Sequence, residues 1–193
     1  MVSGPDRLPL PNSLTEGQQA AVAAISAGPR GALFGPFVPL LRSPALMTRL
    51  QEVGAYLRFE SAVPAHLREL VILMIAREWN QDFEWGHHVP LARTAGLGEQ
   101  VIDALSLRAE ITGAVGTPDV QAVWRLIREL LDLREVTDAA YAEALEAVGA
   151  DGVVDLVATA GYYCTLAMTM NVARTPVPSD YERLPPGSAQ RSQ

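Results

Sequence analysis

Apolar side chains recur at the spacing of an α-helix along most of this chain, and that spacing limits the fold more than any other feature. Residues 44–57 give one example, in which Met47 and Leu50 belong to a helical repeat. The pair Ser43-Pro44 suits the start of this helix, because proline lacks an N–H that would be unpaired there. Strand-like alternation of apolar and polar residues is nowhere sustained. The sequence therefore predicts an all-α bundle.

The pattern predicts about eight helices joined by turns rich in glycine and proline. The first helix begins after Asn12 or Ser13 and carries Glu16 in its first turn. The other seven are expected over residues 44–57, 64–77, 80–94, 99–105, 120–133, 138–148 and 152–173. Together they form a single domain, residues 13–178. An N-terminal segment, 1–12, and a C-terminal tail, 179–193, are predicted to be flexible because Pro, Gly, Ser and Gln are frequent there.

The composition indicates whether the predicted bundle forms an oligomer, where in the cell it is found and which partners it has. Of 193 residues, 49% are hydrophobic and only 19% are charged, which favours a homo-oligomer with a buried subunit interface. No apolar run approaches the ~20 residues of a membrane span, and residues 1–8 lack the pattern of a secretory signal. We therefore expect a cytoplasmic protein without a membrane partner. The net charge of -7, with basic residues scattered singly, argues against nucleic acid as a partner.

The absence of lysine and the presence of only one cysteine exclude several kinds of chemistry. All 15 basic residues are arginine, so a Schiff-base lysine, a P-loop lysine and a pyridoxal phosphate anchor are excluded. Cys164 is the single cysteine, so an intramolecular disulfide and a CxxC redox pair are excluded as well. Its uncharged neighbours offer nothing to lower the pKa of the thiol. We expect Cys164 to pack as a small hydrophobic residue.

The segment 64–77 is expected to be buried on nearly all sides, because its apolar residues occupy two opposite faces of a helix. Glu69 lies on the second of these faces. A buried carboxyl group must be hydrogen-bonded, paired or protonated, and burial raises its pKa towards the range useful for proton transfer. Two interpretations stay open for Glu69. It is either an acid or base in a site, or a structural residue that pairs with Arg68 or Arg77 or is solvated near the helix start.

A second group of polar residues follows on the next expected helix. The positions i, i+3, i+4 and i+7 are occupied by Glu84, His87, His88 and Leu91. A carboxylate and an imidazole one turn apart therefore share a face, and the carboxylate can hold one tautomer of the histidine. Histidine suits proton exchange near neutrality, so an acid/base centre is one interpretation and an ordinary helix-surface pair is the other. We expect no metal, since His66 is the one further histidine that might complete a site.

Seven short stretches of the chain form a recognisable series. They are GPF (35–37), LLRSP (40–44), LRELVIL (67–73), FEWGHHVPLA (83–92), AGL (95–97), GVVDLV (152–157) and GYY (161–163). This series resembles the carboxymuconolactone decarboxylase superfamily, which includes the alkylhydroperoxidase-type reductases. The similarity spans about residues 35–178, and block 69–88 is its most specific part. The resemblance implies an alkylhydroperoxidase-like helical fold, chemistry without a cofactor, and assembly into a trimer or hexamer.

The chain departs from the thiol-peroxidase branch of that superfamily at two positions. The branch carries a glutamate, then cysteines twelve and fifteen residues later, then a histidine nineteen residues after the glutamate. The residues at those positions here are Glu69, Gln81, Glu84 and His88. Neither glutamine nor glutamate can replace a thiolate nucleophile, so we do not expect thiol peroxidase activity.

The resemblance therefore implies a cofactor-independent lyase or isomerase that moves a proton on a small carboxylate- or carbonyl-bearing substrate. The expected catalytic residues are Glu69, Glu84 and His88. The expected substrate-binding residues are His87, Arg42, Tyr162 and Trp85, and Arg30 and Arg58 are further candidates to hold a carboxylate. The alternative hypothesis is a non-catalytic, small-molecule-binding or structural oligomer on the same scaffold. In that case the polar groups of the pocket would all be satisfied internally.

Overall fold

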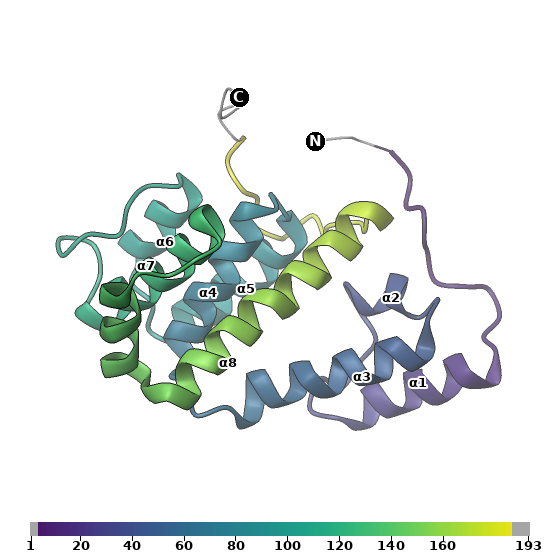
Figure 1. The fold of residues 1–193 in the computed structure, drawn as a ribbon. Coiled ribbons are helices and arrows are strands. Elements are labelled where there is room, and N and C mark those ends of the chain that lie inside the picture. Colours follow the sequence, from purple (N-terminus) through teal and green to yellow (C-terminus); the bar gives the residue numbers. More distant parts are fainter. Residues whose placement is uncertain (1–3, 187–193) are drawn as a thin grey trace.

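The computed structural model describes residues 4–186, and within this range the chain is all-α (Figure 1). Its α-helices are α1 (Glu16–Ala27), α2 (Phe37–Leu40), α3 (Pro44–Ala55), α4 (Ala65–Glu78), α5 (Asp82–Thr94), α6 (Glu99–Ser106), α7 (Pro118–Leu133) and α8 (Asp138–Ala173). A short π-helix, η1 (Tyr56–Glu60), directly continues α3. The predicted fold class is confirmed.

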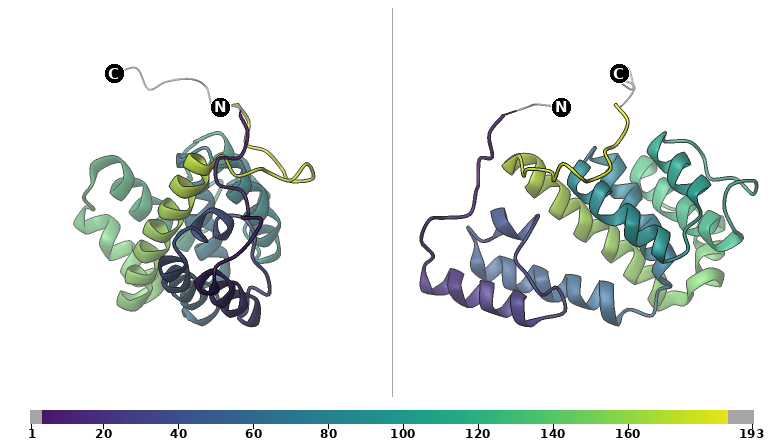
Figure 2. Two further views of the ribbon diagram at one scale, coloured as in Figure 1. Left: turned by 90° about the vertical axis from the view of Figure 1, so that its right-hand side faces the viewer. Right: turned by 180° about the vertical axis from the view of Figure 1, so that it is seen from behind.

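Helix α8 runs diagonally between two groups of helices (Figure 1). One group consists of α1, α2 and α3, and the other of α4, α5, α6 and α7. The view from behind shows the same division (Figure 2). Helix α8 packs against α4 and α7 in the second group and against α2 and α3 in the first. Side chains from both groups therefore meet along α8.

Helix α4 is the centre of the core, as its apolar pattern predicts. Leu67 and every residue from 69 to 77 are buried, and the helix packs against α5, α6, α7 and α8. Each fully buried leucine or isoleucine contributes ~1.5–3 kcal/mol, so this helix holds its neighbours in place. Because Glu69 lies inside the buried stretch, its carboxyl group must find a partner in the interior.

The first helix begins later than the sequence predicts. It starts at Glu16 and not directly after Asn12 or Ser13. Thr15 and Gln18 form a capping box, in which each side chain accepts a hydrogen bond from the backbone N–H of the other. This reciprocal pair satisfies two N–H groups that the start of a helix otherwise leaves open.

Two further features differ from the prediction. Helix α2 has four residues, too few for a periodic pattern to reveal. The π-turn of η1 has no sequence signal of its own. The two helices predicted over 138–148 and 152–173 are both present as the two parts of α8, which meet at a kink at Gly149, where φ is 71° and ψ is 173°. The remaining helices begin and end within two residues of the predicted positions.

Among the described residues, α8 alone is long and apolar enough to cross a membrane. Half of its most apolar stretch is buried inside the molecule, against α4 and α7 in particular. The core helix of a globular domain meets the same criteria of length and composition, and Gly149 interrupts the regular backbone. Burial therefore accounts for the apolar character of α8.

The described part of the N-terminal segment lies against the helices. The backbone N–H of Arg7 donates to the carbonyl of Ala173 at the end of α8, at 2.7 Å. The Arg42 guanidinium donates to the carbonyl of Pro9, also at 2.7 Å. These bonds tie the segment to the end of α8 and to the turn before α3, while the remainder of the predicted segment, residues 1–3, lies outside the described range.

Residues 178–184, which we call the C-terminal strap, cross the outer face of α5. Leu184 is buried, and its N–H donates to the carboxylate of Asp82 at the start of α5, at 3.1 Å. Arg183 donates to the same carboxylate at 3.3 Å. The strap also passes so close to Gly86 that a Cβ there would lie 2.5 Å from Cβ of Tyr181. Residues 187–193 of the predicted tail lie outside the described range.

Gly86→Ala is expected to destabilise the protein by about 1–3 kcal/mol, because the added methyl group overpacks the contact with the strap. The matched control is Gly161→Ala in α8, where a Cβ meets nothing within 4 Å. That change should stabilise the protein by up to about 1 kcal/mol through helix propensity. Urea unfolding measures both. A similar stabilisation by the two substitutions would contradict the contact between Gly86 and the strap.

Candidate functional site

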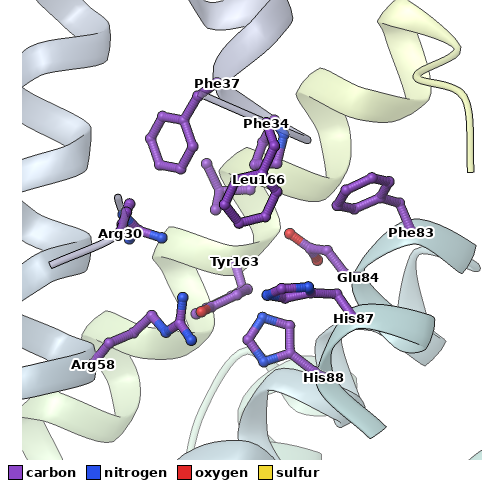
Figure 3. Close-up of a pocket in the computed structure, with 11 residues that line it drawn as sticks. Arg30, Phe34, Phe37, Arg58, Phe83, Glu84, His87, His88, Tyr163 and Leu166 are labelled. Atoms are coloured by element: carbon purple, nitrogen blue, oxygen red, sulfur yellow. The ribbon is translucent and has the colours of Figure 1, made fainter. Parts of the chain in front are cut away.

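A pocket lies where the loop before α2, η1, α5 and α8 meet (Figure 3). Its volume is about 330 Å³ when the open mouth is included. The residues that line this central pocket are Arg30, Phe34, Pro36, Phe37, Arg58, Phe83, Glu84, His87, His88, Tyr163 and Leu166. Apolar side chains form much of the wall, so the polar groups lie in surroundings that hold little water.

Glu84 projects from α5 into the central pocket (Figure 3). The residue is 3% exposed, and neither carboxyl oxygen has a hydrogen-bond partner among the described residues. Burial raises the pKa of Glu84 well above the ordinary value of 4.5. An ionised carboxylate without partners is very costly in such surroundings, so burial favours the neutral, protonated form of Glu84.

Glu69 is in the opposite state. Its Oε2 lies 2.7 Å from Nδ1 of His88, and both side chains are buried. Burial by itself raises the pKa of Glu69, but the charge and hydrogen bond of His88, with help from Arg58 and Arg68, bring the pKa below its ordinary value. Burial lowers the pKa of His88, although Glu69 opposes this. At neutral pH an ionised Glu69 therefore accepts a bond from Nδ1–H of a neutral His88, and Nε2 carries no proton.

His87 is held from outside the pocket by the C-terminal strap. Its Nδ1 lies 3.2 Å from the hydroxyl of Tyr181, and its ring contacts Phe34 with centroids 5.3 Å apart. Burial lowers the pKa of His87 to about 4, and the nearby His88 adds to this effect. His87 is therefore neutral at physiological pH, and Tyr181 occupies one of its two ring nitrogens.

Two arginines supply positive charge to the pocket (Figure 3). Arg30 donates to the hydroxyl of Tyr162 at 3.3 Å and lies 4.7 Å from the ring centroid of Phe37. This pair needs the glycine at position 54, because a Cβ there would lie within 2.3 Å of both the hydroxyl and the guanidinium. Arg58 comes from the π-turn η1. Neither arginine forms an ion pair with an acidic side chain within residues 4–186.

The structure brings together most, but not all, of the residues that the sequence singles out. Glu84, His87 and His88 line the pocket, and Glu69 supports His88 from behind. The bonded partner of His88 is Glu69, so the idea that Glu84 holds its tautomer is wrong. The two proposed arginine partners of Glu69 have other contacts, since Arg68 bonds to the Val63 carbonyl and Arg77 to Asn80.

Three residues predicted to bind substrate do not line the pocket. Arg42 is exposed and donates to the carbonyl of Pro9. Trp85 is 1% exposed and packs in the core. Tyr162 is buried and contacts two residues of the pocket wall, Arg30 by a hydrogen bond and Tyr163 edge to face.

Sequence reasoning did not identify Tyr181, Tyr163 or Phe83 as site residues with a defined position. Tyr163 packs edge-on against His88, with ring centroids 5.2 Å apart. The pair Tyr162-Tyr163 did mark the correct helix, and its buried phenols were the usable signal. Tyr181 had no signal, because it lies in a proline-rich segment without periodicity.

The two positions that carry cysteines in the thiol branch have different tasks here. Gln81 caps α5 by accepting from the N–H of Phe83, and it donates to Asn171 of α8. Glu84 is the neutral acid of the pocket.

Cys164 is half-buried and accepts a hydrogen bond from the indole N–H of Trp79 at 3.3 Å. Within residues 4–186, no group of three or more His, Cys, Asp or Glu is placed to hold a metal ion.

Glu84→Gln is expected to change how stability depends on pH. Folding raises the pKa of Glu84 above 4.5, so the folded protein holds a proton that the unfolded chain has released. This lowers wild-type stability as pH rises above that value, by at most about 1.4 kcal/mol per pH unit. Glu84→Gln should remove the decline, and Glu99→Gln on the surface should not. Urea unfolding from pH 5 to pH 8 compares them, and parallel curves for wild type and Glu84→Gln would contradict a raised pKa.

Tyr181→Phe is expected to release Nδ1 of His87 and let the neutral ring populate both tautomers. The ring nitrogen shifts in long-range ¹H–¹⁵N spectra report this directly. The pKa of His87 should stay near 4, because burial is its main cause. Ring nitrogen shifts identical to those of the wild type would show that the Tyr181 hydroxyl does not set the tautomer.

The sequence of this chain matches one known protein family over part of its length. Residues 44–129 match the model of the carboxymuconolactone decarboxylase family. The matched stretch contains Glu69, Glu84 and His88, whereas Arg30 and Tyr163 lie outside it. Among curated proteins, no sequence matches the chain.

Two solved structures share the fold. One is a protein of unknown function from Agrobacterium tumefaciens, described as a putative antioxidant defence protein AhpD, with 20% identity over 72% of this chain and 94% of that chain and a TM-score of 0.63. The other is an uncharacterized peroxidase-related protein with an alkylhydroperoxidase AhpD core from Ralstonia eutropha JMP134, with 16% identity over 92% of this chain and 95% of that chain and a TM-score of 0.67. At these identities the likeness concerns the fold. The match of residues 44–129 is to the carboxymuconolactone decarboxylase family, and the fold of the chain resembles that of these two structures.

Proposed function

We propose that the protein is a cofactor-independent lyase or isomerase that moves a proton on a small substrate bearing a carboxylate or carbonyl group. The observation that carries this proposal is the presence of two carboxyl groups in opposite states around one pocket. Glu84 is buried and has no hydrogen-bond partner within residues 4–186, while Glu69 is bonded to His88. Enzymes that use an acid and a base together commonly push the pKa values of two such groups apart in this way.

The anionic or carbonyl group of the substrate lies against Arg30 and Arg58 in this proposal. Both side chains line the pocket and lack an acidic partner within the described residues. A guanidinium donates two parallel N–H bonds to a carboxylate, and these bonds strengthen as negative charge develops on an enolate. Phe34, Phe37 and Leu166 then cover the apolar part of the molecule.

His88 is the base. Its Nε2 takes a proton from the carbon next to the carbonyl group, and the electron pair of that C–H bond moves into an enolate. Glu69 stabilises the resulting imidazolium through the bond to Nδ1–H, as the carboxylate does in other carboxylate–histidine pairs.

Glu84 is the acid. In a substrate with a double bond next to the deprotonated carbon, the enolate extends over that bond as a dienolate. The O–H of Glu84 gives a proton to the far carbon of the dienolate, which completes a shift of the double bond, and His88 returns a proton to Glu84. In a lyase reaction no C–H bond is broken first. A C–C bond breaks, carbon dioxide leaves, and the electron pair of that bond forms the enolate. Glu84 then protonates the carbon and recovers its own proton from solvent.

The alternative function is binding without catalysis. That hypothesis expects every polar group of the pocket to be satisfied internally, as Glu69 is by His88. The two carboxyl oxygens of Glu84 disfavour it, because no described residue bonds to them and they are left for a ligand. Thiol peroxidase activity is not part of the proposal, since Cys164 is the single sulfur nucleophile of the chain.

We also infer that the protein acts as a homo-oligomer in the cytoplasm, with a small molecule and neither nucleic acid nor membrane as its partner. Large apolar side chains on η1 and the adjacent part of α8 support an oligomer. Tyr56, Phe59 and Val154 are 46%, 49% and 67% exposed. The hydroxyl of Tyr56 donates to Asp155 at 3.3 Å, so η1 and α8 share this face. A trimer or hexamer of the kind implied by the resemblance would cover it.

Glu69→Gln is expected to slow proton transfer at least about 100-fold, the lower range of general acid–base catalysis, because it weakens His88 as a base. Small carboxylates and ketones are first screened for ligand-induced thermal shift. Those that bind are then incubated in D₂O, and ¹H NMR follows the loss of the C–H signal next to the carbonyl group. This readout detects proton transfer even when the full reaction is unknown.

Glu143→Gln is the matched control, because Glu143 is an exposed carboxylate that pairs with Arg125 away from the pocket. It should exchange deuterium at the wild-type rate, and light scattering should show the same oligomer for all three proteins. Exchange that persists undiminished in Glu69→Gln would rule out the proposed roles. Ligands that bind the wild type without any exchange would support the binding function instead.

A further inference from the structure

A second pocket lies between the C-terminal end of α4, the segment that follows α6, and α7. It has a volume of about 340 Å³ with its mouth included, and we call it the arginine pocket after Arg77, Arg108 and Arg128. It shares no lining residue with the central pocket. Its chemistry is therefore separate from the proposed function.

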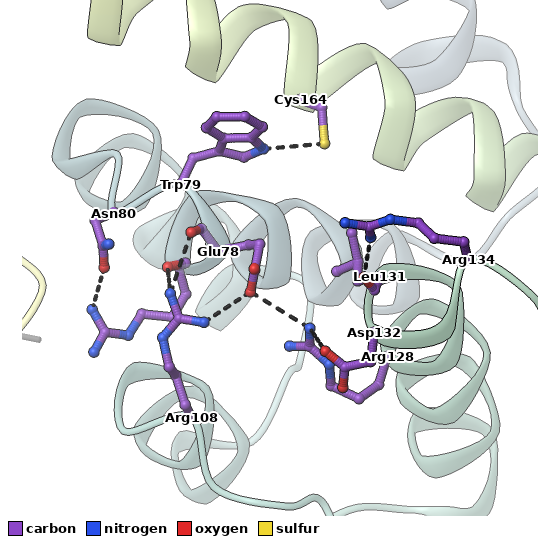
Figure 4. A network of polar contacts seen from close by, with 10 residues as sticks. Glu78, Trp79, Asn80, Arg108, Arg128, Leu131, Asp132, Arg134 and Cys164 are labelled. Carbon is purple, nitrogen blue, oxygen red and sulfur yellow. Dashed lines mark hydrogen bonds and ion pairs between the residues drawn. The ribbon is translucent and has the colours of Figure 1, made fainter. Parts of the chain in front are cut away.

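Two guanidiniums, those of Arg108 and Arg128, share the carboxylate of Glu78 beside this pocket (Figure 4). Glu78 lies 2.8 Å from Arg108 and 3.5 Å from Arg128. Arg128 also donates to Asp132 at 2.7 Å. Arg77 is the third arginine that lines the pocket, and Asp82 and Glu78 act on its charge without pairing with it.

Arg77 has no acidic side chain at ion-pair distance within residues 4–186. The residue is 6% exposed, and its hydrogen bond goes to the neutral amide oxygen of Asn80, at 2.8 Å. The Nε atoms of Arg77 and Arg128 are buried without a partner among the described residues. Burial, together with the charge of Arg108, lowers the pKa of Arg77. A buried charge in this condition is stabilised strongly by an anion that enters the pocket.

Arg108 has a structural role that Arg77 lacks. Arg108 donates to the backbone carbonyls of Arg77 and Glu78 at the end of α4, at 2.8 and 3.2 Å. Cationic side chains commonly satisfy the free carbonyls of a helix end in this way. The guanidinium of Arg77 makes no comparable bond to a carbonyl or a carboxylate within residues 4–186.

We propose that the arginine pocket binds the carboxylate of a small organic acid with an apolar body. The guanidinium groups match the two oxygens of a carboxylate, and Met74, Leu105 and Trp124 lie beside them to contact the rest of the molecule. A carboxylate adds one negative charge next to Glu78, whereas a doubly charged phosphate adds two and is repelled more strongly by that side chain.

Benzoate is the probe for this site, and the indole N–H signal of Trp124 is the readout. The chain has three tryptophans, so three indole signals appear in a ¹H–¹⁵N spectrum, and Trp124→Phe identifies the relevant one. Benzoate is expected to shift that signal saturably in the wild type. Benzyl alcohol, which lacks the charge, and inorganic phosphate should shift it far less.

Arg77→Gln should weaken benzoate binding about tenfold or more, as the loss of a charge-assisted pair does. Arg49→Gln removes an equal charge from an exposed site on α3 and should leave the affinity unchanged. The indole signals of Trp79 and Trp85 report whether each variant keeps its fold. Should Arg77→Gln fail to fold, Ala109→Phe fills the pocket without altering any charge and should abolish the shift.

The proposal is overturned if benzoate does not move the Trp124 signal, or if Ala109→Phe or a folded Arg77→Gln responds as the wild type does. A shift by phosphate as large as that by benzoate would overturn the assignment to an organic monocarboxylate.

Discussion

The hydrogen bond between Glu69 and His88 is the interaction on which the site depends. It joins α4, the most buried helix, to α5, the helix that carries Glu84, His87 and His88 of the central pocket. Because it fixes how α5 is rotated about its axis, Glu84 one turn earlier must face the same space as His88. The C-terminal strap holds α5 from the other side through Asp82 and the contact at Gly86. The helix that bears the chemistry is thus fixed on two sides.

The same burial produces two opposite electrostatic results. The carboxyl group of Glu69 is buried but has a hydrogen-bond donor at 2.7 Å, so it stays ionised. The carboxyl group of Glu84 is buried and has no donor among the described residues, so burial keeps it protonated. One carboxyl group therefore raises the basicity of a histidine, and the other has a proton to give. Arg30 and Arg58 place positive charge where the product of that transfer would be anionic.

The sequence predicted the fold and the centre of the site because both follow from local spacing. The apolar faces around Glu69 predicted that α4 is buried, and the i, i+3, i+4 spacing placed Glu84, His87 and His88 on one face. Periodicity does not encode which residue of another helix meets that face, so the partner of His88 was assigned to Glu84 in error. Arg42 and Trp85 were expected in the pocket and do not line it. The reason is the same, because neither a position in the chain nor a residue type determines where a side chain points. Tyr181 reaches the site through tertiary packing of a segment without any repeat.

The central claim is that Glu84 is protonated at neutral pH while Glu69 is ionised. Carbon-13 NMR of protein labelled at the glutamate side-chain carboxyl carbon tests it most directly, because that carbon shifts on ionisation. At pH 7 the account predicts one buried glutamate signal at the position of a protonated acid, which Glu84→Gln removes. It predicts an ionised signal that Glu69→Gln removes. Spectra in which every glutamate is ionised at pH 7 would contradict the account.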